Sequence, residues 1–80
     1  MPRRQRYVLS EIVRAALNKA GLMGAYDARP TYQRNDYVGW IQRAKREETR
    51  AGRLAQMLDE LRAGDVYMKM AWRPGSQRHP

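Results

Sequence analysis

The chain has 80 residues, no cysteine and a marked basic excess, with 16 Lys and Arg against 8 Asp and Glu and a formal net charge of +8. This length allows one small domain with one hydrophobic core, and the lack of cysteine excludes a disulfide framework, a thiol nucleophile and a thiolate metal site. No apolar run approaches the roughly 20 residues of a membrane span, and Glu11 and Arg14 interrupt any signal-peptide core, so we expect a soluble, cytoplasmic protein.

The basic excess is carried mainly by arginine, because Lys19, Lys45 and Lys69 are the only lysines. A surface of this kind attracts an anionic partner, which could be an acidic protein, a nucleic acid or an anionic surface. High arginine usage also follows from GC-rich coding. Basicity by itself therefore leaves open whether such a partner exists.

A first helix is predicted over residues 10–20 from the helical spacing of its apolar side chains. Ser10 is a suitable N-cap, and Gly21 is well placed to end the helix in a left-handed conformation. The apolar positions that recur are Leu9, Ile12, Val13, Ala16, Leu17 and Ala20.

A second helix is predicted over residues 32–45, after a connector at residues 21–30 whose Tyr26 folds back onto the core. Pro30 disfavours helical geometry at the residue before it, so the helix starts after the proline. Its apolar stripe consists of Tyr37, Val38, Trp40, Ile41 and Ala44.

A third helix is predicted to start after the Lys45–Glu47 junction and to end at Gly64. No proline or glycine enforces a break at this junction. A continuous helix, however, would leave two apolar stripes facing unrelated directions, so we expect the break. The stripe of the third helix consists of Leu54, Met57, Leu58 and Leu61.

The predicted fold is all-α, a compact three-helix domain with a short extended C-terminal segment. In this division, residues 1–7 are a mobile basic arm, 8–65 the helical domain, 66–73 an extended segment packed on the helices, and 74–80 a disordered tail. The predicted core consists of Leu9, Ile12, Val13, Leu17, Tyr26, Tyr37, Trp40, Ile41, Leu54, Leu58 and Leu61. A homodimer could form through the exposed apolar side chains Met68, Met70 and Trp72.

The residues with catalytic potential do not form a recognisable constellation. The only histidine is His79, beside the C-terminal proline. Glu47 and Glu48 are adjacent, so they point apart on a helix, and helix-dipole stabilisation explains them. No glycine-rich phosphate loop follows a strand. We therefore expect no enzyme activity, no metal site and no cofactor.

A basic cluster surrounds the junction between the second and third helices, and its members are Arg43, Lys45, Arg46, Arg50 and Arg53. The outline is similar to a helix-turn-helix, but Glu47 and Glu48 in the first turn of the third helix would repel phosphates. A solvated basic face is the simpler interpretation. Tyr37 and Trp40 could stack on bases, although their helical spacing indicates core residues.

The stretch "DYVGWIQRAKREETRAGRLAQMLDEL" resembles the YdeI/OmpD-associated family, also called bacteriocin-protection proteins. The matching positions are Tyr37, Trp40, Ile41, Ala44, Lys45, Arg46, Glu48, Thr49, Arg50, Arg53, Leu54, Leu58, Leu61 and Gly64. The resemblance extends more loosely over residues 8–65. Many family members have proline where this chain has Glu47, and many carry this module behind a second domain.

The resemblance implies a small helical bacterial module, without established catalytic residues, that is associated with envelope stress and with protection against bacteriocins or antimicrobial peptides. We expect it to bind an anionic partner through its Arg-rich face; the alternative is a nucleic-acid-binding accessory protein. Glu48, Thr49 and Arg50 are candidates for a structural junction, in which Glu48 or a helix C-terminal carbonyl accepts from the guanidinium groups. The other interpretation of this junction is an anion site at the start of the third helix.

Overall fold

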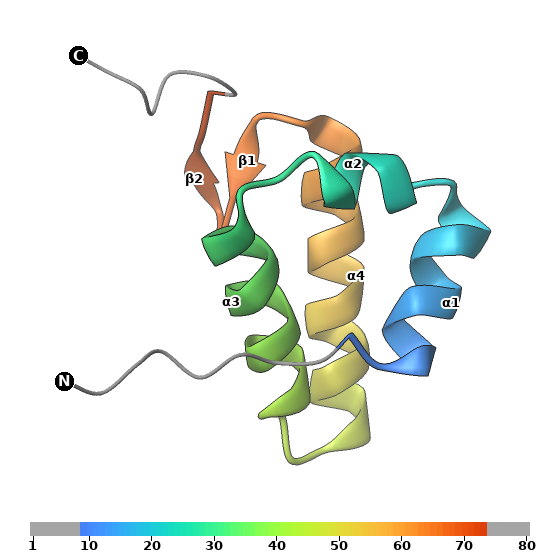
Figure 1. The fold of residues 1–80 in the computed structure, drawn as a ribbon. Coiled ribbons are helices and arrows are strands. Elements are labelled where there is room, and N and C mark those ends of the chain that lie inside the picture. Colours follow the sequence, from blue (N-terminus) through green and yellow to red (C-terminus); the bar gives the residue numbers. More distant parts are fainter. Residues whose placement is uncertain (1–8, 74–80) are drawn as a thin grey trace, which may run out of the picture.

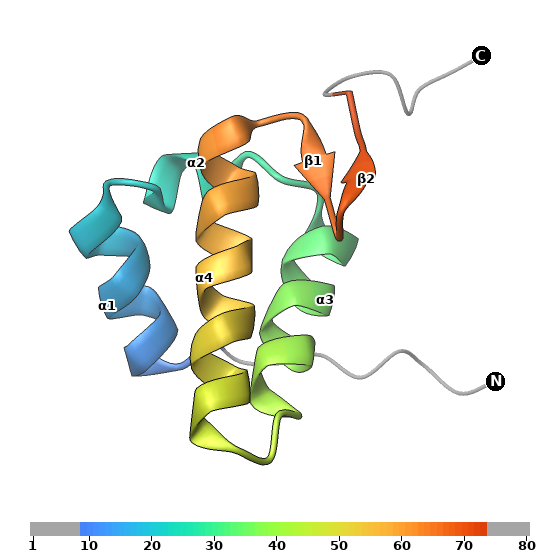
Figure 2. The same ribbon diagram turned by 180° about the vertical axis from the view of Figure 1, so that it is seen from behind.

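The computed structural model describes residues 9–73, which form four helices and one two-stranded antiparallel sheet. The long helix α4 (Glu47–Ala63) lies between α1 (Glu11–Ala20) and α3 (Thr31–Gln42), as Figures 1 and 2 show from opposite sides. The predicted arm, the predicted tail and His79 lie outside the described residues.

The two ends of this helical layer are built differently (Figure 1). A short helix, α2 (Met23–Asp27), and the hairpin of β1 (Val66–Tyr67) and β2 (Met70–Ala71) lie at the end where α4 finishes. The loop between α3 and α4 lies at the opposite end. At each end, the unpaired backbone N–H and C=O groups of different helix termini therefore need hydrogen-bond partners.

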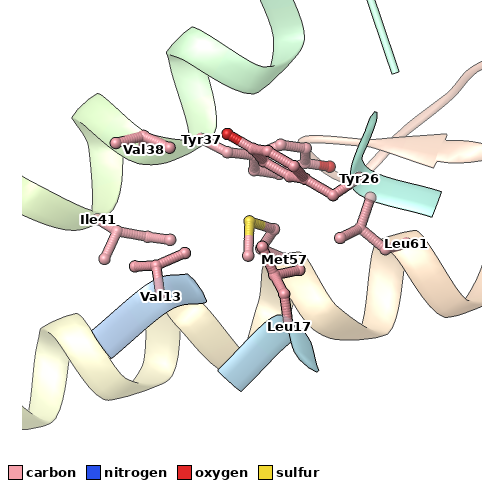
Figure 3. Packing of buried hydrophobic residues seen from close by; sticks show 8 residues of the cluster. All are labelled: Val13, Leu17, Tyr26, Tyr37, Val38, Ile41, Met57 and Leu61. Atoms are coloured by element: carbon pink, nitrogen blue, oxygen red, sulfur yellow. The ribbon is translucent and has the colours of Figure 1, made fainter. Parts of the chain in front are cut away.

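Eight buried side chains from α1, α2, α3 and α4 form one cluster, with Met57 near its centre (Figure 3). The helical stripes explain the cluster, because each helix turns its apolar side chains towards the others. Its members are Val13, Leu17, Tyr26, Tyr37, Val38, Ile41, Met57 and Leu61. The predicted core residues Leu9, Trp40, Leu54 and Leu58 are only partly buried against this cluster.

The placement of Ile12 in the core is wrong, because its side chain is 71% exposed. Val13 and Leu17, one turn apart, supply the inward face of α1. The position before Val13 is rotated by about 100° around the helix axis, which points Ile12 away from the core.

The local signals for α1 are confirmed. The Ser10 side chain accepts a hydrogen bond from the Val13 N–H, and Gly21 has the left-handed conformation with φ 71°. Gly64 ends α4 in the same way, with φ 86°. The expected break is also present, because residues 43–46 are not helical and α3 ends three residues earlier than predicted.

The fold is not strictly a three-helix domain, and the C-terminal segment is not a single extended strand. Part of the predicted connector forms α2, which buries Tyr26. The chain then reverses at Met68 and Lys69, so that Tyr67 pairs with Met70 and Val66 with Ala71. The alternating apolar pattern was correct for extended structure but contained no turn residue to announce the reversal.

Candidate functional site

The predicted basic junction lies where α3 ends and α4 begins (Figure 1). After Gln42 the chain turns back over residues 43–46, and α4 starts at Glu47. Arg46 has an extended backbone, with φ −99° and ψ 146°, and its side chain does not cap the helix. The last carbonyls of α3 have no partner within their own helix, so this corner needs donors from elsewhere.

Two arginines from the first two turns of α4 supply such donors. Arg50 Nη2 donates to the carbonyl oxygen of Ala44 over 2.9 Å, and Arg53 Nη1 donates to that of Trp40 over 2.6 Å. The Arg53 guanidinium also lies 5.3 Å from the centroid of the Trp40 ring, where the ring face attracts a cation. Positive charge at a helix C-terminus is stabilising. These contacts join α3 to α4.

The other three cations of the predicted cluster, Arg43, Lys45 and Arg46, are exposed on the loop. Arg46 lies 3.8 Å from Glu48, with both side chains about four-fifths exposed, and a pair of this kind adds little to stability. Thr49 is half-buried. The structure thus divides the predicted cluster into two arginines that donate to backbone carbonyls, of Trp40 in α3 and of Ala44 in the loop, and three cations on the surface.

An apolar cavity of about 150 Å³ lies beside this corner. Its apolar walls come from three helices and consist of Ile12, Val13, Ile41, Ala51 and Leu54. Glu47 and Arg50 add one charge of each sign to the lining, and Ser10 and Gln42 complete it. The exposed side chain of Ile12 is therefore part of a recess and not an isolated surface residue.

A buried carboxylate organises the opposite end of the molecule. Glu60 is 5% exposed, and each of its two carboxylate oxygens accepts two hydrogen bonds. Oε1 accepts from the Tyr37 hydroxyl and from the Met68 N–H, the latter over 2.8 Å. Oε2 accepts from the Lys69 N–H over 2.8 Å and from Gln56 Nε2 over 3.0 Å. Glu60 therefore connects α3, α4 and the hairpin.

The hairpin turn depends on this carboxylate. Met68 and Lys69 have φ values of 50° and 64°, as the two central residues of a type I′ turn require. This conformation costs a non-glycine residue about 1–2 kcal/mol. Since Glu60 accepts from both N–H groups, it offsets the strain and holds the turn against α4.

The same contacts set the ionisation of the cluster. Burial by itself would raise the pKa of Glu60, but the hydrogen bonds from Tyr37, Lys69, Met68 and Gln56 outweigh burial and lower it. Burial raises the pKa of Tyr37, and the hydrogen bond to Glu60 raises it further. At neutral pH, Glu60 is therefore a carboxylate and Tyr37 a neutral hydroxyl.

Arg29 is a second buried polar residue at this end and is only 4% exposed. Its Nη1 donates to Gln33 Oε1 and its Nη2 to the backbone carbonyl of Glu60, each over 3.0 Å. The Trp72 ring covers the guanidinium at 4.5 Å from the ring centroid. Arg29 therefore ties the segment before α3 to the end of α4 and to the residue after β2.

An aromatic contact fixes β1 to α3. The Tyr67 ring packs edge-on against Tyr32 and Tyr37, with centroid distances of 5.9 and 5.5 Å. Its hydroxyl donates to Asp36 Oδ2 over 2.5 Å. Of the apolar residues considered for a dimer surface, Met68 and Trp72 are partly buried, and Met70 is 58% exposed.

Sequence reasoning missed Glu60 and Arg29. A signal for Glu60 was present, because it lies three residues after Met57 and directly before Leu61, on the buried stripe of α4. A carboxylate at such a position needs several donors to be buried. No comparable signal marks Arg29, because it precedes a proline and lies outside every helical stripe.

Within residues 9–73, no group of three His, Cys, Asp or Glu side chains is placed to hold a metal ion. No helix in this part of the chain is long and apolar enough to span a bilayer.

The sequence model of a family described as OmdA, bacteriocin-protection, YdeI or OmpD-associated, matches residues 6–64. Neither a curated protein nor a solved structure matches the chain. The hairpin at residues 66–71 lies beyond the matched segment, although Tyr37 and Glu60, which hold it, lie within that segment.

Proposed function

The chain belongs to the bacteriocin-protection, YdeI or OmpD-associated family, and on this premise we propose that it is a non-catalytic binding module. It acts in envelope stress or in protection against bacteriocins or antimicrobial peptides. It does so by binding an anionic partner through the basic corner between α3 and α4.

The observation that carries this proposal is the exposed loop at residues 43–46, in which Arg43, Lys45 and Arg46 are three of the four residues. Three cations in so short a segment concentrate positive charge, and this charge attracts an anionic partner. Arg53 contacts the Trp40 carbonyl of α3 and Arg50 contacts the Ala44 carbonyl of the loop itself, so the loop is presented from a fixed support. A positioned loop on a rigid scaffold is a frequent location for binding residues.

The buried polar cluster supports a non-catalytic role. A general acid or base has to reach the proton that it transfers. Glu60, by contrast, is buried and uses both oxygens to accept from Tyr37, Gln56 and the hairpin turn. Its lowered pKa also moves it away from the range in which a carboxylate exchanges protons at neutral pH.

The charge distribution favours an acidic protein over nucleic acid as the partner. Glu47 and Glu48 occupy the first turn of α4 and are exposed beside the loop. A nucleic-acid backbone offers only phosphates here, and these two carboxylates would repel them. A folded protein can present carboxylates to the loop and other groups to Glu47 and Glu48.

The test is complementation of a native strain that lacks the gene, under bacteriocin challenge. The triple variant Arg43→Glu, Lys45→Glu and Arg46→Glu should fail to restore survival. A control with the same net charge reverses three exposed cations elsewhere, Arg14→Glu, Lys19→Glu and Arg62→Glu. The control should restore survival, and melting curves should show that both variants are folded at the assay temperature.

Pull-downs from native lysate with the same two variants identify the partner as material retained by the wild type and the control but lost from the loop variant. Full survival with the loop variant would refute the proposal. In a gel shift with DNA and RNA, binding whose logarithm falls steeply with the logarithm of salt concentration would favour the nucleic-acid alternative instead.

A further inference from the structure

The cavity beside the α3–α4 corner has the dimensions of a single side chain. Its volume of about 150 Å³ equals that of an engineered protein cavity that binds benzene. The walls contributed by Val13, Ile41 and Leu54 are apolar, so water inside gains few hydrogen bonds. A phenyl or branched aliphatic group replaces that water at a gain in free energy.

The lining of the cavity includes the residues on either side of the basic loop. Gln42 precedes the loop and Glu47 follows it, and both line the cavity. Arg50 lies on the same wall, where its hydrogen bond to the Ala44 carbonyl holds the guanidinium in position. An occupant of the cavity therefore lies next to the Arg50 guanidinium and the Glu47 carboxylate, and the loop cations lie between two lining residues in the chain.

We infer that this cavity receives one aromatic or branched aliphatic side chain of an acidic peptide segment, whose neighbouring carboxylates lie against Arg43, Lys45 and Arg46. The inference rests on the proposed function and names the chemistry of the anionic partner. The side chain in the cavity acts as an anchor that fills a pocket, while the charges around it select the sequence that carries it.

The spread of charge argues for a peptide and against a small aromatic acid. The cavity accommodates one ring, whereas the three loop cations lie outside its lining. A single carboxylate next to the ring cannot reach all of them. A peptide segment with acidic residues on both sides of the side chain in the cavity can reach all three cations. Such a segment also covers Ile12, whose side chain is 71% exposed at the cavity.

The experiment compares amidated pentapeptides by fluorescence anisotropy on the full-length protein. The first has a phenylalanine between two pairs of aspartates, the second replaces the phenylalanine by alanine, and the third replaces the aspartates by lysines. The first should bind about tenfold or more tightly than the second. The third should not bind.

Protein variants then separate the cavity from the charges. Ala51→Leu places a larger side chain on the cavity wall and should abolish the difference between the phenylalanine and alanine peptides. Ala55→Leu, one turn further along α4 and also exposed, lies outside the lining and should preserve that difference. Glu47→Gln removes the one carboxylate of the lining and should tighten binding of both acidic peptides. Unchanged melting temperatures exclude misfolding as the cause.

Equal affinity of the phenylalanine and alanine peptides for the wild type would overturn the cavity inference. If the loop triple variant then bound neither peptide, the proposed function would still stand. Binding of phenylacetate alone as tightly as the phenylalanine peptide would overturn the peptide as occupant. Failure of both acidic peptides to bind would overturn the inference. If the loop triple variant also restored survival, the proposed function would fall with it.

Discussion

Replacement of Glu60 by glutamine tests how the hairpin is held to the helices. The side chain keeps its shape but has one acceptor oxygen in place of two. Each carboxylate oxygen now accepts two hydrogen bonds, from Tyr37 and Met68 on one side and from Lys69 and Gln56 on the other. Whichever way the amide is turned, its NH₂ group faces one backbone donor that cannot become an acceptor, Met68 or Lys69, and one side chain, of Tyr37 or Gln56, that can turn to accept.

The expected loss of stability follows from the one backbone N–H that loses its acceptor and from the loss of charge at the remaining contacts. A hydrogen bond to a charged group contributes about 1.5–3 kcal/mol and one between neutral groups about 0.5–1.5 kcal/mol, so one lost contact and the weakening of the others should make Glu60→Gln cost about 3 kcal/mol. A chain of this length has a free energy of unfolding of about 4–12 kcal/mol. The melting temperature should therefore fall by about 12–24 °C.

Denaturant unfolding measures the loss, and amide hydrogen exchange locates it. Protection should fall most at the N–H groups of Met68 and Lys69, which donate to Glu60. Asp59→Asn is the matched control, because Asp59 is exposed and pairs with an exposed arginine, Arg62. A loss for Glu60→Gln as small as that of the control, within about 0.5 kcal/mol, would show that the buried carboxylate does not hold the hairpin.

The same substitution has a defined pH dependence. The folded-state pKa of Glu60 is lowered from its ordinary value of 4.5, so the stabilisation is fully present above about pH 4.5 and is lost as the pH falls through the folded-state value. Protonated Glu60 is neutral, like glutamine. The difference in stability between wild type and Glu60→Gln should therefore shrink in acid, and a difference independent of pH would refute this account.

Three further predictions concern other contacts. Arg53→Ala should lower the free energy of unfolding by about 1–2 kcal/mol, because a charged donor to a helix carbonyl is lost. The control Arg62→Ala removes an exposed ion pair and should lower it by no more than about 0.5 kcal/mol. Equal losses for the two variants in denaturant unfolding would rule out the role of Arg53. Lys69→Gly should raise the free energy of unfolding by about 0.5–1 kcal/mol, since glycine adopts φ 64° without strain. The control Ala71→Gly in β2 should lower it. If both variants melted at a lower temperature than the wild type, the backbone at Lys69 would not be strained. Burial and the contact with Glu60 raise the pKa of Tyr37 above its ordinary value of 10.0. The contribution of Tyr37 to stability is therefore present below pH 10.0 and is lost as the pH rises further. Melting temperatures that stay constant into strong alkali would disprove this.

Interactions between near neighbours in the chain are predictable from the residues alone. Ser10 caps α1 and Gly21 ends it because the relevant groups lie within three or four positions of one another. The break before α4 follows from the different directions of two apolar stripes, and Gly64 marks the end of that helix. Residues 37–64 also carry the family pattern, which the match over residues 6–64 confirms.

Residues whose partners are distant in the chain acquired their roles only in the tertiary structure. Glu60 accepts from Tyr37, 23 positions away, and from the turn at Met68 and Lys69, which contains no residue that favours a positive φ. Arg29 finds the Glu60 carbonyl 31 positions away. In the basic cluster, neighbouring arginines look alike in sequence, and only the end of α3 decides which of them meet carbonyl oxygens. Local chemistry determined where helices begin and end; the burial of polar groups, which requires every donor and acceptor to be matched in space, was determined by packing.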